Sequence, residues 1–151
     1  MKTYHFMAGL PRSGSTLLKS LIDQNPNIHT EPVSSVMELM YHTEQYFKTS
    51  EQYQGYPKPQ NAHKMISSFI ENQYYEREEE IIIDHCRAWP NNIERLKTYI
   101  TPNPKIICPV RDIVEVLTSF ITMIHRNSDE LNFVDKALMD GGFTVDDDNR
   151  C

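Results

Sequence analysis

A glycine-containing turn between an apolar segment and a helical pattern constrains this chain most. The turn reads Gly9-Leu10-Pro11-Arg12-Ser13-Gly14-Ser15-Thr16. The apolar run that precedes it, residues 4–8, predicts a strand. The segment that follows, residues 15–24, repeats leucine and isoleucine at helical spacing and predicts a helix. A strand, a turn and a helix in this order are the context in which a loop can bind phosphate.

The turn also carries the groups that hold a compact anion. Backbone N–H groups at a helix start, together with the positive end of the helix dipole, attract negative charge. Arg12 adds a planar set of charged donors, and Ser13, Ser15 and Thr16 add hydroxyls. The glycine spacing is that of a phosphate-binding loop, but Ser15 stands where loops that bind nucleoside triphosphates carry lysine. The pattern therefore favours an anion site and weakens the case for an ATP or GTP enzyme.

The rest of the chain predicts strands that alternate with helices. Two further strands are expected over residues 80–84 and 105–110, helices over 35–48, 62–79, 93–100, 113–124 and 128–139, and a loop over 49–61. This alternation predicts an α/β class, a three-layer P-loop-like fold with a central parallel sheet flanked by helices, as a single domain over residues 1–151. Three strands are fewer than such sheets usually have. Either the chain is part of a longer protein, or a partner such as a second copy in a homodimer covers the sheet edge.

Composition excludes several classes of protein. Fifteen Lys and Arg against 21 Asp and Glu give a net charge of −6, which argues against nucleic-acid or anionic-membrane binding. The longest aliphatic run, residues 81–83, is too short to span a membrane. The three cysteines lack metal-binding spacing, and Cys108 is expected to be a buried thiol in its apolar run. With no signal peptide expected, these features favour a reducing, cytoplasmic location.

Residues 6–18, FMAGLPRSGSTLL, with the following LIDQNP, resemble the 5′-phosphosulfate-binding segment of sulfotransferases. These enzymes use 3′-phosphoadenosine 5′-phosphosulfate (PAPS) and release its desulfated product, PAP. The Pro-Arg-Ser-Gly form is similar to the tyrosylprotein sulfotransferases and their bacterial relatives, whereas the cytosolic small-molecule enzymes carry lysine in place of Arg12. The resemblance implies PAPS as co-substrate. No metal is expected, because a sulfuryl group carries less charge than a γ-phosphoryl group.

A second segment is similar to the part of this family that binds the 3′-phosphate. Residues 106–119, IICPVRDIVEVLTS, place Arg111 at a strand end and Ser119 eight residues later. Eight residues are about two helical turns, so both side chains can face one phosphate. The implied cofactor-binding residues are Pro11, Arg12, Ser13, Gly14, Ser15, Thr16, Arg111 and Ser119. The family domain is usually longer, and its C-terminal part, which covers the adenosine, is expected to be missing.

Sulfuryl transfer needs a base for the acceptor, donors that offset charge on the transferring group, and stabilisation of the leaving phosphate. The resemblance implies that Glu31, which follows the first helix, is the base, with His29 as a poorer alternative. Arg12 would offset charge on the transferring group. An exposed loop residue is the other interpretation of Glu31.

The segment after the second predicted strand departs from the family pattern. Relatives usually carry lysine after the aspartate that corresponds to Asp84, and this chain has His85. A protonated His85, or Arg87, would then stabilise the leaving group. The alternative is that Asp84 and Arg87 are structural and that Trp89 packs under a helix.

The sequence thus predicts a sulfotransferase that moves a sulfuryl group from PAPS to a hydroxyl, in line. The acceptor could be a peptide tyrosine, a sugar or a lipid head group, because specificity lies in loops. Two other functions stay open. One is a P-loop nucleotide kinase or NTPase, and the other is a non-catalytic relative that keeps the PAP-binding cradle.

Overall fold

The structure is a computed structural model that describes residues 2–126, 133–142 and 144. The chain divides into two compact units. The first comprises Met1–Leu10 and Gly14–Pro109, and it holds the sheet with helices α1 to α5. The second comprises Pro11–Ser13 and Val110–Cys151, and it holds helices α6 and α7.

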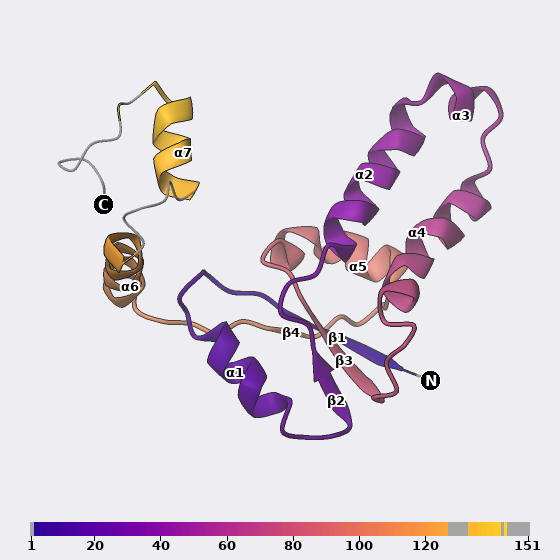
Figure 1. Cartoon of the computed structure of the whole chain (residues 1–151). Coiled ribbons are helices and arrows are strands. Elements are labelled where there is room, and N and C mark those ends of the chain that lie inside the picture. Colours follow the sequence, from indigo (N-terminus) through magenta and orange to yellow (C-terminus); the bar gives the residue numbers. More distant parts are fainter. Residues whose placement is uncertain (1, 127–132, 143, 145–151) are drawn as a thin grey trace. The chain divides into compact units, whose positions relative to one another are not determined.

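The first unit is built on a parallel sheet. Its strands are β1 (Thr3–Met7), β2 (Ile28–Thr30), β3 (Ile81–His85) and β4 (Ile106–Ile107), in the order β2-β3-β1-β4. Every pairing is parallel, and the register sets Tyr4 opposite Ile82 and Phe6 opposite Ile106. These pairings confirm the predicted α/β fold with a central parallel sheet (Figure 1). Strand β2 was not predicted, and β4 is shorter than expected.

The helices follow the predicted alternation. In the first unit they are α1 (Ser15–Ile22), α2 (Val36–Thr49), α3 (Glu51–Gly55), α4 (Pro59–Gln73) and α5 (Ile93–Tyr99), with a 3₁₀ turn, η1, at Trp89–Asn92. In the second unit they are α6 (Ile113–Arg126) and α7 (Phe133–Asp140). Of the helix predicted over 128–139, residues 128–132 lie outside the described residues.

The segment 49–61, predicted as a loop, is partly helical instead. The Ser50 side chain accepts a hydrogen bond from the Tyr53 N–H, which caps α3 at its start. Helix α4 begins at Pro59, because proline is well suited to a first helical turn where its missing N–H has no intrahelical partner. Glycine and proline here therefore mark helix ends and not an extended loop.

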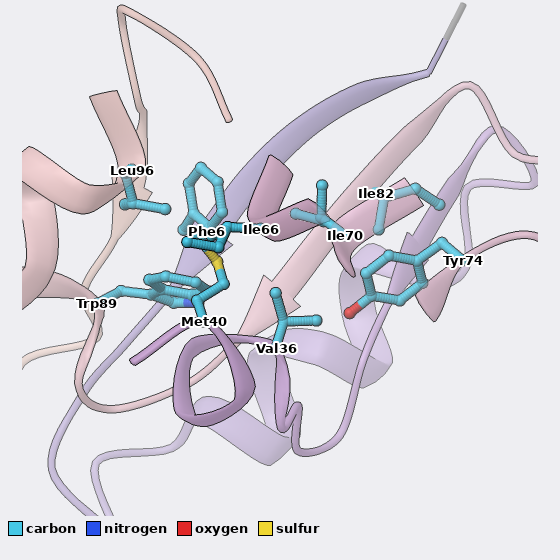
Figure 2. Packing of buried hydrophobic residues seen from close by; sticks show 9 residues of the cluster. All are labelled: Phe6, Val36, Met40, Ile66, Ile70, Tyr74, Ile82, Trp89 and Leu96. Atoms are coloured by element: carbon cyan, nitrogen blue, oxygen red, sulfur yellow. The ribbon is translucent and has the colours of Figure 1, made fainter. Parts of the chain in front are cut away.

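The hydrophobic core lies between one face of the sheet and helices α2, α4 and α5 (Figure 2). It consists of Phe6, Val36, Met40, Ile66, Ile70, Tyr74, Ile82, Trp89 and Leu96. The Phe6 and Trp89 rings pack edge to face with centroids 5.1 Å apart. Helix α1 lies on the other face of the sheet (Figure 1), so the central strands are covered on both sides. This explains why β3 begins with three isoleucines instead of alternating with polar residues.

The direction of the strands determines where the candidate site segments begin. Because the strands are parallel, their carboxyl ends meet at one edge of the sheet. Ligands bind at this edge in open α/β sheets. The turn after β1, the Glu31 segment after β2 and the Asp84–Trp89 segment at the end of β3 all begin there.

The structure also describes two of the cysteines and the lengths of the helices. Cys108 is exposed and not buried, because β4 ends at Ile107 and the thiol lies beyond the paired strands. Cys86 is partly buried, and burial raises the pKa of its thiol. In the part of the chain that the structure describes, no helix combines the length and apolar character needed to cross a membrane.

Candidate functional site

The start of α1 has the backbone geometry that an anion site needs. Gly14 precedes the helix with φ 97° and ψ 10°, a left-handed conformation that glycine adopts without steric cost. The first helical bond runs from the Leu18 N–H to the Gly14 carbonyl, at 3.0 Å. The N–H groups before Leu18 in the first turn therefore have no intrahelical acceptor. The first turn contains no acidic side chain that would occupy them.

Arg12 is held in a strained backbone conformation. Its φ is 67°, and no other non-glycine residue described by the structure has a positive φ. Such conformations cost on the order of 1–3 kcal/mol and cluster at functional sites. The Arg12 Nε donates to the Ser119 Oγ at 2.9 Å, and the Arg12 carbonyl accepts from the Arg111 Nη1 at 3.2 Å. The structure therefore brings together three predicted site residues from two distant motifs.

These three residues line a cavity of about 500 Å³ in the second unit. Its lining also includes Glu115, Thr122 and Arg126. Glu115 pairs with Arg111, with 2.7 Å between Oε2 and Nε. Three arginines against one carboxylate leave the cavity positive, which suits an anionic ligand.

Sequence reasoning missed Glu115 and Arg126, although a signal for both exists. Glu115 is four residues after Arg111, and Arg126 is seven residues after Ser119. Both intervals place side chains on one face of a helix. A search along the helix face, in addition to the family motif, would have found them.

Ser13 provides a test of whether the turn fits a phosphate-like group. Its residue is 9% exposed, and its Oγ is buried with no hydrogen-bond partner among the described residues. Buried polar atoms nearly always have a partner, so each exception requires an explanation. An anion held at the turn would supply the missing acceptor. The residues present therefore fit a phosphate or phosphosulfate group.

Glu31 continues the ladder of β2, since its N–H donates to the Ile83 carbonyl at 3.0 Å. Its side chain is 21% exposed and pairs with His29, with 3.2 Å between Oε2 and Nε2. The carboxylate also borders a cavity of about 490 Å³ at the end of α4, lined in part by Asn72 and Gln73. Glu31, just beyond β2, is thus a partly buried carboxylate beside an open space.

His85 is fixed at the end of β3. It lies opposite Met7 in the register, and its Nδ1 is 2.7 Å from the Pro32 carbonyl. A carbonyl only accepts, so Nδ1 carries the proton and Nε2 is left available. In the neutral form Nε2 is an acceptor. His85 must therefore be protonated before it can donate to a leaving phosphate.

Asp84 is a structural anchor. It is fully buried, and its carboxylate accepts from the Tyr74 hydroxyl and from the Trp89 Nε1, each at 2.7 Å. Burial raises the pKa of the Asp84 carboxyl, although hydrogen bonds from Ser34, Tyr74 and Trp89 oppose the shift. Burial also raises the pKa of the Tyr74 hydroxyl. The carboxylate joins β3 to the end of α4 and to η1, which holds the segment that carries His85.

Asp84→Asn should lower the free energy of unfolding by about 1–3 kcal/mol, because one of the two buried donors loses its acceptor. The folded-state pKa of Asp84 lies above the unfolded-state value of 3.8. The stabilisation from this carboxyl is therefore complete below the unfolded-state pKa and is lost as the pH rises through the folded-state pKa.

The loss on substitution should accordingly be larger near pH 4 than at pH 7. Urea unfolding followed by the fluorescence of Trp89, the single tryptophan, measures it. Tyr74→Phe is the matched variant, because it removes one donor and keeps the carboxyl. If the loss of unfolding free energy caused by Asp84→Asn were larger at pH 7 than at pH 4, this account would be contradicted.

One comparison with known proteins identifies the chain's relatives. A sequence model described as "Sulfotransferase family" matches residues 5–141, which is most of the 151-residue chain. The matched range includes the turn, Glu31, His85, Arg111 and Ser119. Among curated protein sequences, none matches this chain significantly.

Proposed function

Because the chain belongs to the sulfotransferase family, we propose that it transfers a sulfuryl group from PAPS to a hydroxyl acceptor. The family assignment supports a transferase of sulfur-containing groups that uses a sulfuryl donor and an acceptor. The identity of the donor, the residues that hold it and the base are the proposal.

The contact between the two anion motifs carries this proposal. Arg12 belongs to the glycine-containing turn, and Ser119 and Arg111 belong to the segment that resembles a 3′-phosphate site. Their hydrogen bonds of 2.9 and 3.2 Å join the motifs, although the residues are about a hundred positions apart. A nucleotide with anionic groups at both its 5′ and 3′ positions is a ligand that would use both motifs.

The residues divide into two groups by the part of the donor they would hold. The turn, residues 11–16, would hold the 5′-phosphosulfate with the Arg12 guanidinium, the Ser13 hydroxyl and the N–H groups at the start of α1. Arg111 and Ser119 would hold the 3′-phosphate. The Ser119 Oγ accepts from Arg12, so its own proton is left to donate to an anion.

PAPS would supply an activated sulfuryl group and a phosphate leaving group. Glu31 would take the proton of the acceptor hydroxyl, since its carboxylate faces a cavity that an acceptor could enter. His85, in its protonated form, would donate from Nε2 to the leaving phosphate, because Nδ1 is held by the Pro32 carbonyl. Arg12 would offset charge on the transferring group.

The test combines nucleotide binding with turnover. Calorimetry with PAP, 5′-AMP and ATP with Mg²⁺ should give the tightest binding for PAP, without metal. Transfer of labelled sulfate from PAPS to a panel of phenols, sugars and lipid head groups should then identify an acceptor. Preference for ATP with Mg²⁺ would favour the kinase alternative. PAP binding without turnover on any acceptor would favour a non-catalytic relative, consistent with a His85 that needs a second proton.

Arg111→Ala should weaken PAP binding about tenfold or more while leaving 5′-AMP binding nearly unchanged. A charge-assisted contact contributes roughly 1.5–3 kcal/mol to binding. Only PAP has a 3′-phosphate that can make this contact, so only PAP should lose it. Calorimetric titration of both nucleotides measures the difference. Equal losses for PAP and 5′-AMP would instead indicate that Arg111 supports the turn through its bond to the Arg12 carbonyl.

A further inference from the structure

The cavity beside Ser119 extends along α6 to a third arginine. Arg126 lines the same cavity as Arg12 and Arg111, and it is the last residue of α6. It lies about 10 Å beyond Ser119 along the helix axis. Long helical side chains lean toward the helix N-terminus. The guanidinium of Arg126 can therefore reach back toward the level of Ser119.

Several of the other polar groups of this cavity already have partners. Arg111 has its Nε on Glu115 and its Nη1 on the Arg12 carbonyl. The hydroxyls of Thr118 and Thr122 donate to helix carbonyls, each at 2.8 Å. Two of the cavity's donors are thus committed within the helix, and the charge of Arg111 is offset by a carboxylate.

Arg126 is different. Among the described residues it has no hydrogen-bond or ion-pair partner, and its side chain is exposed. Among the described residues, no carboxylate offsets the charge of Arg126. Arg12 also contacts the Ser119 Oγ, at 2.9 Å, but the proposed function assigns its charge to the 5′-phosphosulfate. Glu115 offsets part of the charge of Arg111, so a further cation would strengthen the binding of a phosphate dianion at Ser119.

We propose that Arg126 is the second cationic contact of the 3′-phosphate at Ser119, and that it sets the preference for a nucleotide phosphorylated at the 3′ position. This inference rests on the proposed function, because it assigns a residue to the same donor. It predicts that the selectivity for PAP over 5′-AMP depends on Arg126 as well as on Arg111.

The experiment is calorimetric titration of PAP and 5′-AMP with the full chain and with Arg126→Gln, Arg126→Lys and Lys64→Gln. Lys64 lies exposed on α4, so its substitution makes the same charge change outside the cavity. Arg126→Gln should weaken PAP binding about tenfold and 5′-AMP binding by less than about twofold. Arg126→Lys should restore most of the loss, because it restores the charge.

Two different results would overturn the assignment of Arg126 to the 3′-phosphate. If the full chain binds PAP no better than 5′-AMP, the proposed donor fails and this inference fails with it. If the full chain prefers PAP and Arg126→Gln keeps that preference, or loses no more than Lys64→Gln does, only the role of Arg126 is wrong. A purely helix-stabilising Arg126 would lower the thermal midpoint and weaken both nucleotides equally, which also contradicts the proposal.

Discussion

Replacing Arg12 with alanine should lower sulfuryl transfer by about 10²–10³-fold, which is typical for the loss of one preorganised donor at a developing charge. PAP affinity should fall at the same time, by about tenfold or more for a charge-assisted contact. The effect is expected to be large because one side chain serves two purposes. In the proposed function its guanidinium offsets charge on the transferring group, and its Nε orients Ser119 through a 2.9 Å hydrogen bond.

The backbone conformation of Arg12 lets two substitutions separate the role of its side chain from that of its backbone. Alanine carries a Cβ, so Arg12→Ala leaves the cost of φ 67° in place and removes only the rest of the side chain. Arg12→Gly removes the side chain and relieves the strain as well, so a difference between the two variants isolates the backbone contribution. Arg12→Lys should be milder, because it keeps the charge but not the planar fork.

The measurement is transfer from labelled PAPS beside a PAP titration for each variant, with Lys64→Gln as the control for the loss of one positive charge. If Arg12→Ala kept full affinity for PAP and PAPS, the turn would not be the phosphosulfate site. The hydrogen bond to Ser119 would then be a purely structural link between two segments of the second unit.

The parts of the fold that were predictable are those whose cause is local. Three consecutive isoleucines are typical of a strand buried on both faces, and residues 81–83 lie in such a strand. A left-handed position before a helix favours glycine, and Gly14 provides it with φ 97°. The spacing of two helical turns predicted that Arg111 and Ser119 can face one phosphate. The hydrogen bond between Arg12 and Ser119 was not predicted.

The parts that were not predictable depend on neighbours distant in the sequence. Strand β2 has three residues and carries no strand signal of its own, since it is held by the ladder of β3. Helix α3 lies in a polar, glycine- and proline-containing segment whose composition is typical of a loop. The pairing of Glu31 with His29 follows from an extended backbone that places alternate side chains on one face, and this became visible only once β2 was known.

Glu31→Gln should lower the rate of sulfuryl transfer by about 10²–10⁴-fold, the usual contribution of general-base catalysis. Glutamine keeps the size of the side chain and an oxygen that can accept from His29, so the 3.2 Å contact can survive the change. It cannot accept the proton of the acceptor hydroxyl. PAP affinity should be unchanged, because Glu31 borders the cavity at the end of α4 and not the arginine-lined cavity.

The matched control is Glu38→Gln, which makes the same chemical change on an exposed helix position whose ion-pair partner is His42. Turnover at saturating acceptor, measured beside a PAP titration, separates loss of the base from loss of donor binding. His85→Ala should also lower turnover, whereas His85→Lys should raise it, because lysine donates without needing the second proton that His85 requires. Full turnover by Glu31→Gln would remove this carboxylate from the mechanism. The base would then have to be sought at His29 or at the available Nε2 of His85, and the residual activity of His29→Gln and His85→Ala would distinguish those two residues.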